Sequence, residues 1–163
     1  MSQTRSIAFT KMNGLGNDFV VIDARREAAS LGAAQVCALA ARNNEVTNGC
    51  DQLLILHPPR NTGDVFMQIF NADGSEVEAC GNGARAVAAY LSRLGTSEPV
   101  IETLSGILQT RIATQGETKF SPKVIMPTPL RGWQDIPLAE AMPDTSCITL
   151  HSDLPPAFMV NVG

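Results

Sequence analysis

The chain has 163 residues, of which 44% are hydrophobic and 17% charged, and its formal net charge is −4. That length allows one domain with a sizeable core, or one domain and part of another. The acidic charge balance provides no basic surface for nucleic acid, and no apolar run is long enough to cross a bilayer. We therefore expect a cytoplasmic protein with no nucleic-acid partner and no membrane partner.

Two strands are predicted near the start of the chain, over residues 6–12 and 18–24. The stretch between them, residues 13–17, contains two glycines and two asparagines, which indicates a tight connection with exposed backbone. Asn17, at the exit of this connection, is a candidate to face a ligand. A plain hairpin turn explains the same residues equally well.

An alanine-rich helix is predicted over residues 33–42, and a strand over the apolar run at 53–56. A continuous apolar run of this kind is typical of a strand buried on both faces. Polar residues at the mouth of such a strand often point into a site, so Gln52 is a candidate binding residue. The next predicted strand, residues 65–70, leads into a turn at residues 71–74.

The most informative stretch is residues 70–95, which places Cys80 directly before a predicted helix over residues 84–94. Apolar side chains recur at helical spacing on most of its faces, so the helix should be largely buried. Gly95 is placed to end it and Asn82 to cap its start. A helix N-terminus favours an anion and favours the thiolate, the reactive form of a cysteine. A small buried cysteine is the plainer alternative.

Beyond this helix the sequence favours strands and turns. A hairpin is predicted from residues 99–104 and 107–114, and residues 127–129 are typical of a linker. Further strands are predicted over residues 120–126, 147–150 and 157–162. The fold expected from these elements is α+β, with a mostly antiparallel sheet wrapped around a central buried helix.

The cysteines and glycines raise two alternatives, a zinc site and a dinucleotide site. Cys37, Cys50, Cys80 and Cys147 form no C-x-x-C pair, and with only two histidines they make a poor zinc set, so we expect no metal and free thiols. Residues 81–86 match the pattern G-x-G-x-x-A of a dinucleotide site, with Glu102 at a strand end about 20 residues on. No apolar strand directly precedes that pattern, so we rank dinucleotide binding behind thiol chemistry.

Three separated motifs together resemble one family. Residues 11–19 read KMNGLGNDF, residues 51–54 read DQLL, and residues 70–85 read FNADGSEVEACGNGAR. In this order they resemble diaminopimelate epimerase, an isomerase of lysine and cell-wall synthesis that needs no pyridoxal cofactor. The resemblance spans essentially the whole chain.

What the resemblance implies is specific. Family members consist of two similar halves, each a sheet around a central helix, and the intact protein is a candidate homodimer. They interconvert LL- and meso-diaminopimelate with two cysteines on opposite faces of the α-carbon, one acting as thiolate base and the other as thiol acid. The catalytic cysteine corresponds to Cys80. The substrate-holding residues correspond to Asn17, Gln52, Asn71, Gly81 and Asn82.

The chain also departs from this family in two respects. A second cysteine in a glycine-rich helix start is absent, and Asn13 stands where the family commonly has histidine. We expect residues 1–126 to form the first half and residues 127–163 the start of an incomplete second half. We therefore expect the 163-residue chain alone not to turn over substrate. A non-catalytic fragment, or a ligand-binding or assembly module, is the alternative.

Overall fold

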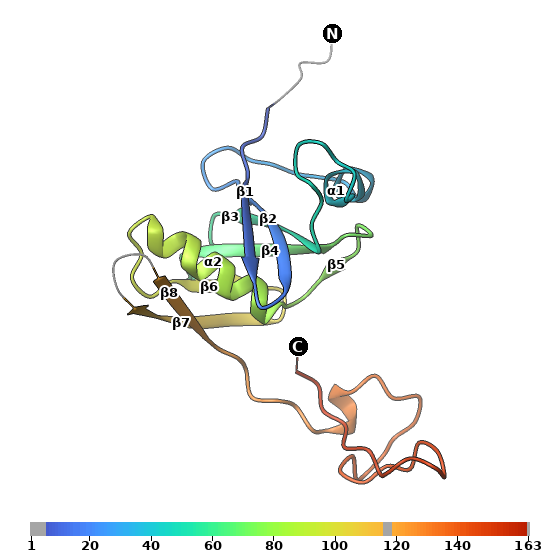
Figure 1. Ribbon diagram of the computed structural model, residues 1–163. Helices are drawn as coiled ribbons and strands as arrows, with labels where there is room; N and C mark the ends of the chain where they lie inside the picture. The colour runs from blue at the N-terminus through green and yellow to red at the C-terminus, as the bar shows by residue number, and fades with distance from the viewer. Residues whose placement is uncertain (1–5, 116–118, 163) are drawn as a thin grey trace. The chain divides into compact units, whose positions relative to one another are not determined.

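The computed structural model describes residues 6–115 and 119–162. The chain divides into two compact units, Met1–Met126 and Pro127–Gly163, and each is considered by itself. Within the described residues, the first unit contains the strands of the sheet and the two α-helices (Figure 1). Its strands are β1 Thr10–Gly14, β2 Asn17–Asp23, β3 Gln52–His57, β4 Val65–Asn71, β5 Glu76–Val77, β6 Val100–Thr103, β7 Gly106–Gln115 and β8 Lys119–Ile125. Its helices are α1 Ala33–Ala40 and α2 Gly81–Arg93.

The strands form one mixed sheet in the order β1-β2-β3-β4-β6-β7-β8, with β5 paired to β4 outside this path. The pairs β2–β3 and β4–β6 are parallel, and the other described pairs are antiparallel. The fold is therefore α+β, but the sheet is mixed where the sequence suggested a mostly antiparallel one. Each parallel pair needs a crossover, which is provided by α1 for the first and by α2 for the second.

Helix α2 packs against β1 and β2 near one end of the strand order and against β7 and β8 at the other end. Since both ends contact one helix, the sheet curves around α2, as Figure 1 shows. The side chains on this face form the larger core, which includes Phe19, Leu54, Leu56 and Leu91, each fully buried.

The opposite face of the sheet carries a second core beneath α1. Alternate residues of the same strands point to it, so that Leu53 and Ile55 lie on this face while Leu54 and Leu56 lie on the α2 face. Because β3 is covered on both faces, all four residues are apolar and fully buried.

Several element boundaries differ from the sequence expectation. β1 begins at Thr10 instead of residue 6, and α2 begins at Gly81 instead of residue 84. The hairpin of β6 and β7 is confirmed, and the helix ends before Gly95, whose φ of 103° is left-handed. The described helices include none that is long and apolar enough to cross a membrane.

In the second unit the two predicted strands at residues 147–150 and 157–162 are wrong. The described residues there make only isolated bridges, Ile148 with Ala157 and Leu130 with Asn161. Two consecutive prolines, Pro155 and Pro156, separate the predicted strands, and proline provides no N–H for strand pairing. This unit also contains one short 3-10 helix, Trp133–Asp135.

Candidate active site

Three strand ends deliver polar side chains to one rim of the α2 face. Asn17 begins β2, Gln52 begins β3 and Asn71 ends β4. Gln52 is in register with Asn71 on one side and with Phe19 on the other. In each strand, the residues two and four positions away from the polar residue belong to the core on the α2 face. They are Phe19 and Val21 for Asn17, Leu54 and Leu56 for Gln52, and Ile69 and Met67 for Asn71. The period of two therefore directs all three polar side chains to the face that carries α2.

Helix α2 begins at the same rim, and its N-cap residue is Cys80. The Cys80 Sγ atom accepts a hydrogen bond from the backbone N–H of Gly83 at 3.2 Å. The N–H groups of Gly81 and Asn82, in the first turn, have no intrahelical acceptor. The expectation that Asn82 caps the helix is wrong, because Gly81 and Gly83 are helical instead of forming a bend before it.

Side-chain hydrogen bonds tie the strand ends to one another and to the helix. Asn82 Nδ2 donates to Asn17 Oδ1 at 2.9 Å, and Gln52 Nε2 donates to Asn71 Oδ1 at 3.1 Å. All four of these residues and Cys80 are half-buried, so they remain accessible to a ligand. The structure thus gathers the candidate residues named from the sequence at the start of α2.

A cluster of charges lies behind Asn17. Asp51 Oδ2 accepts the backbone N–H of Asp18 at 2.9 Å and lies 3.4 Å from Asn17 Nδ2. Arg42 bridges Asp18 and Asp51, and Lys11 pairs with Asp18 at 2.8 Å. The Arg42 guanidinium, followed by the Lys11 ammonium and the Asp51 N–H, holds the pKa of Asp18 far below its usual value. Sequence reasoning missed Arg42, Asp51 and their ion pairs, which join residues far apart in the chain.

The turn between β1 and β2 borders this cluster. Leu15 and Gly16 both have positive φ, of 51° and 89°, so the stretch is a hairpin turn with left-handed residues. It also lines a cavity of about 440 Å³ together with Arg42 and Asp51. The hairpin turn is therefore confirmed and lines this cavity, while the ligand-facing role of Asn17 stays a prediction.

Glu102 has a different task from the one that a dinucleotide site would require. Its carboxylate accepts hydrogen bonds from the backbone N–H groups of Arg60, Asn61 and Gly63 at 2.7 to 3.1 Å. These donors hold the pKa of Glu102 below its usual value. The side chain is buried and occupied by the loop that precedes β4, so it is not presented to a ribose.

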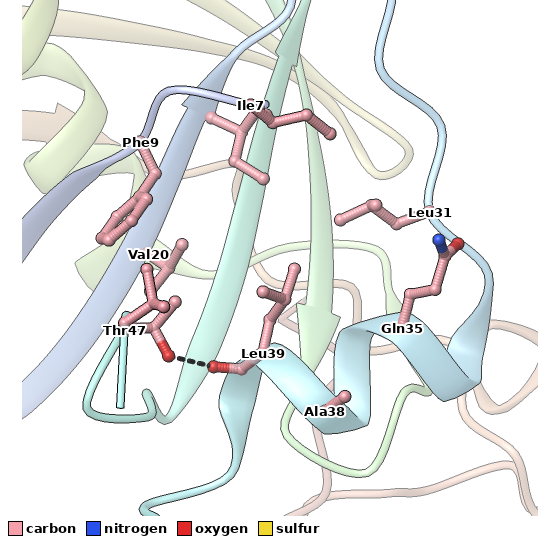
Figure 2. Close-up of a pocket in the computed structure, with 10 residues that line it drawn as sticks. Ile7, Phe9, Val20, Leu31, Gln35, Ala38, Leu39 and Thr47 are labelled. Carbon is pink, nitrogen blue, oxygen red and sulfur yellow. Dashed lines mark hydrogen bonds between the residues drawn. The ribbon is translucent and has the colours of Figure 1, made fainter. Parts of the chain in front are cut away.

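A second cavity lies on the opposite face of the sheet, beside α1. It has a volume of about 360 Å³, and Figure 2 shows its mainly apolar lining. The polar groups there are Gln35 and Thr47, and the Thr47 hydroxyl donates to the carbonyl oxygen of Leu39. Among the described residues, the lining of this cavity includes no cysteine and no charged side chain.

The family model described as diaminopimelate epimerase matches residues 9–128. This range contains the whole rim described above. The chain belongs to the diaminopimelate epimerase family. Two curated relatives bear that name: one from Zymomonas mobilis, 42% identical over 158 residues, and one from Sphingopyxis alaskensis, 44% identical over 155 residues. These alignments cover 97% and 95% of this chain but 55% and 53% of the relatives, so the chain spans about half their length.

Solved structures resemble this fold at lower identity. A protein described as a predicted epimerase from Pseudomonas aeruginosa matches with a TM-score of 0.55 and 19% identity, over 76% of this chain and 46% of that one. A phenazine biosynthesis protein of Bacillus anthracis matches with a TM-score of 0.52 and 23% identity, over 76% and 39% of the two chains. At these identities the likeness supports the fold alone.

Proposed function

We propose that this chain supplies one of the two acid/base thiols of a diaminopimelate epimerase, and that the thiol is Cys80. The single observation that carries the proposal is the convergence of Asn17, Gln52 and Asn71 on the helix start that Cys80 caps. The substrate would be an amino acid whose α-carbon changes configuration. Family membership supports diaminopimelate as that amino acid.

The proposed chemical step is a proton transfer at the α-carbon. The Cys80 thiolate takes the α-proton, so that a C–H bond breaks, an S–H bond forms and the electron pair stays on the α-carbon. That pair delocalises into the neighbouring carboxylate. A second thiol on the opposite face of the carbon then returns a proton, as the family resemblance implies. Cysteine suits the role of base because a fraction of thiolate exists near neutral pH.

The start of α2 would stabilise the charge that builds up on the substrate. The N–H groups of Gly81 and Asn82 point out of the first turn and can donate to the substrate carboxylate. Fixed donors of this kind are worth roughly 100- to 1,000-fold each in rate when charge develops on the bound oxygen. This role needs no cofactor, because the carboxylate itself accepts the electron pair.

The division of the chain into two units suggests which residues belong to each half of the enzyme. We propose that residues 1–126 form the half that carries the first thiol, and that the segment from Pro127 onward belongs to the second half. The intact two-half enzyme would be a cytoplasmic protein. It is also a candidate for a homodimer.

The proposal is tested by alkylation of the purified chain with iodoacetamide, with and without saturating diaminopimelate. Peptide mapping follows each cysteine separately, so the exposed Cys147 is an internal control. The expected result is that diaminopimelate slows alkylation of Cys80 and leaves Cys147 unchanged. Equal rates at Cys80 with and without the amino acid would contradict the proposal.

A further inference from the structure

Two chains of hydrogen bonds run away from the candidate site, and each ends on a carboxylate. In the first, Asn82 Nδ2 donates to Asn17 Oδ1, and Asn17 Nδ2 faces Asp51 Oδ2. In the second, Gln52 Nε2 donates to Asn71 Oδ1, and Asn71 Nδ2 donates to Ser75 Oγ at 3.1 Å.

The second chain is completed by a short bond. The Ser75 hydroxyl donates to Asp73 Oδ1 at 2.6 Å, so its oxygen is left to accept from Asn71. Hydrogen bonds from the Ser75 hydroxyl and backbone N–H hold the pKa of Asp73 below its usual value. Asp73 is therefore a carboxylate at neutral pH, and a carboxylate can only accept.

The terminal carboxylates fix the direction of every amide in the two chains. An amide that turned over would place its oxygen against an acceptor, and Asn17 or Asn71 would also place its NH₂ group against the NH₂ group of the next amide. Both contacts are repulsive, so each amide keeps its NH₂ group toward the carboxylate and its oxygen toward the site. At the site end, the described residues provide no donor to Asn82 Oδ1 or to Gln52 Oε1.

We propose that Asp51 and Asp73 are positioning residues that make Asn82 and Gln52 each present a carbonyl oxygen, and not an NH₂ group, to the bound amino acid. Two oriented acceptors select an N–H donor such as a protonated amine. The helix N–H groups select the carboxylate of the same ligand. This inference rests on the proposed function for the identity of the ligand, but not for the direction of the two chains.

Nuclear magnetic resonance of the side-chain amides tests the direction without any ligand. Ser75→Ala removes the link to Asp73 and should shift or double the NH₂ signals of Gln52 and leave those of Asn82 in place. Asp51→Asn should shift or double the NH₂ signals of Asn82 and leave those of Gln52 in place. Ser75→Thr keeps the hydroxyl and should restore the Gln52 signals.

A matched control exists in the second unit. Ser146 donates to Asp144 through its N–H at 2.8 Å and its hydroxyl at 2.6 Å, which repeats the local turn of Asp73 and Ser75 without an amide chain behind it. Ser146→Ala should move neither the Gln52 nor the Asn82 signals. If Ser75→Ala leaves Gln52 unmoved, or disturbs Asn82 equally, the positioning role is overturned.

Protection of Cys80 against alkylation tests the consequence for binding. Diaminopimelate carries two ammonium groups, whereas pimelate has the same two carboxylates and no ammonium group. Ser75→Ala and Asp51→Asn should each weaken protection by diaminopimelate about tenfold and protection by pimelate less than about twofold. Equal weakening for the two ligands overturns the inference. If neither ligand protects the unaltered chain, the proposed function fails, while the amide signals still decide the positioning role.

Discussion

The two helices begin in different surroundings, although both pack on the same sheet. Helix α1 starts after the exposed Gly32, whose N–H is bonded to the Gln35 side chain at 2.9 Å, and the cavity beside the helix is mainly apolar. Helix α2 starts at Cys80, where the ends of β2, β3 and β4 deliver amide side chains. Both helix starts offer N–H groups. Strand ends that meet on one face, and not a helix start or a large cavity by itself, therefore mark the candidate site.

The largest effect should come from the sulfur that distinguishes the two helix starts. Cys80→Ser should lower exchange of the α-proton of diaminopimelate in D₂O by at least about 100-fold, because a serine hydroxyl is far less acidic than a thiol and provides almost no ionised form to act as the base near neutral pH. Proton nuclear magnetic resonance follows the exchange. Cys37→Ser, within α1, is the control and should leave the rate unchanged. Exchange that continues at the same rate in Cys80→Ser would show that the sulfur at the start of α2 is not the base.

A pair of core substitutions in β3 separates the two faces. Leu53 and Leu54 are adjacent and fully buried, but Leu53 lies on the α1 face and Leu54 on the α2 face beside Gly83. Changing either to alanine should lower the free energy of unfolding by about 2 to 5 kcal/mol, measured by urea denaturation. Only Leu54→Ala should also change the rate at which iodoacetamide modifies Cys80. An equal change for Leu53→Ala would mean that the faces are coupled.

Gly74 brings the turn after β4 close to the start of α1. Gly74 follows β4 with a φ of 83°, and a Cβ there would lie 2.8 Å from the carbonyl oxygen of Ala33 in α1. Gly74→Ala should therefore destabilise the protein by roughly 1 to 3 kcal/mol, because it adds both strain and a clash. Gly14→Ala is the control, since nothing lies within 4 Å of its Cβ position. Thermal unfolding that is the same for both variants would contradict this link.

The ion pairs near the α2 start should give a smaller, pH-dependent effect. Since the pKa of Asp18 is lowered in the folded state, its contribution is present above the unfolded value of about 3.9 and is lost as pH falls through the folded value. Asp18→Asn should cost about 1 kcal/mol at pH 7, because Arg42 is largely exposed and the pair is screened. Urea denaturation at pH 7 and at pH 2 should show the difference shrinking in acid. A constant difference would disprove the linkage.

The smallest effect is expected at the start of α1. Gln35→Ala removes the bond to the Gly32 N–H and should cost about 0.5 kcal/mol, as an exposed cap does. Alkylation of Cys80 should be unchanged. A change at Cys80 would show that the α1 start belongs to the same functional region.

Much of this arrangement could be predicted from local patterns. The apolar run before His57 predicts a strand covered on both faces, and helical spacing predicts α2 and its end before Gly95. The start of α2 was misplaced because Gly81 and Gly83 resemble a bend, while the sulfur of Cys80 provides the acceptor that lets the helix begin earlier. The helix propensities of the individual residues do not reveal this hydrogen bond from the Gly83 N–H to the Cys80 sulfur.

The sheet order and the hydrogen-bond chains could not be predicted in this way. The parallel pairing of β2 with β3 depends on register between segments that are distant in sequence. The contact of Asp51 with Asn17 spans 34 positions and that of Asn82 with Asn17 spans 65. Such pairs follow from the tertiary fold, so the sequence could propose the individual site residues but not their partners.

Binding of the substrate carboxylate at the start of α2 is tested most directly by titrating the ¹⁵N-labelled chain with diaminopimelate and following the backbone amide signals. The signals of Gly81 and Asn82 should shift most, because their N–H groups bind the carboxylate. Signals of Gln35 and Leu39, beside the apolar cavity of Figure 2, should stay in place. Shifts that gather around that cavity, with none at Gly81 and Asn82, would show that diaminopimelate does not bind at the start of α2.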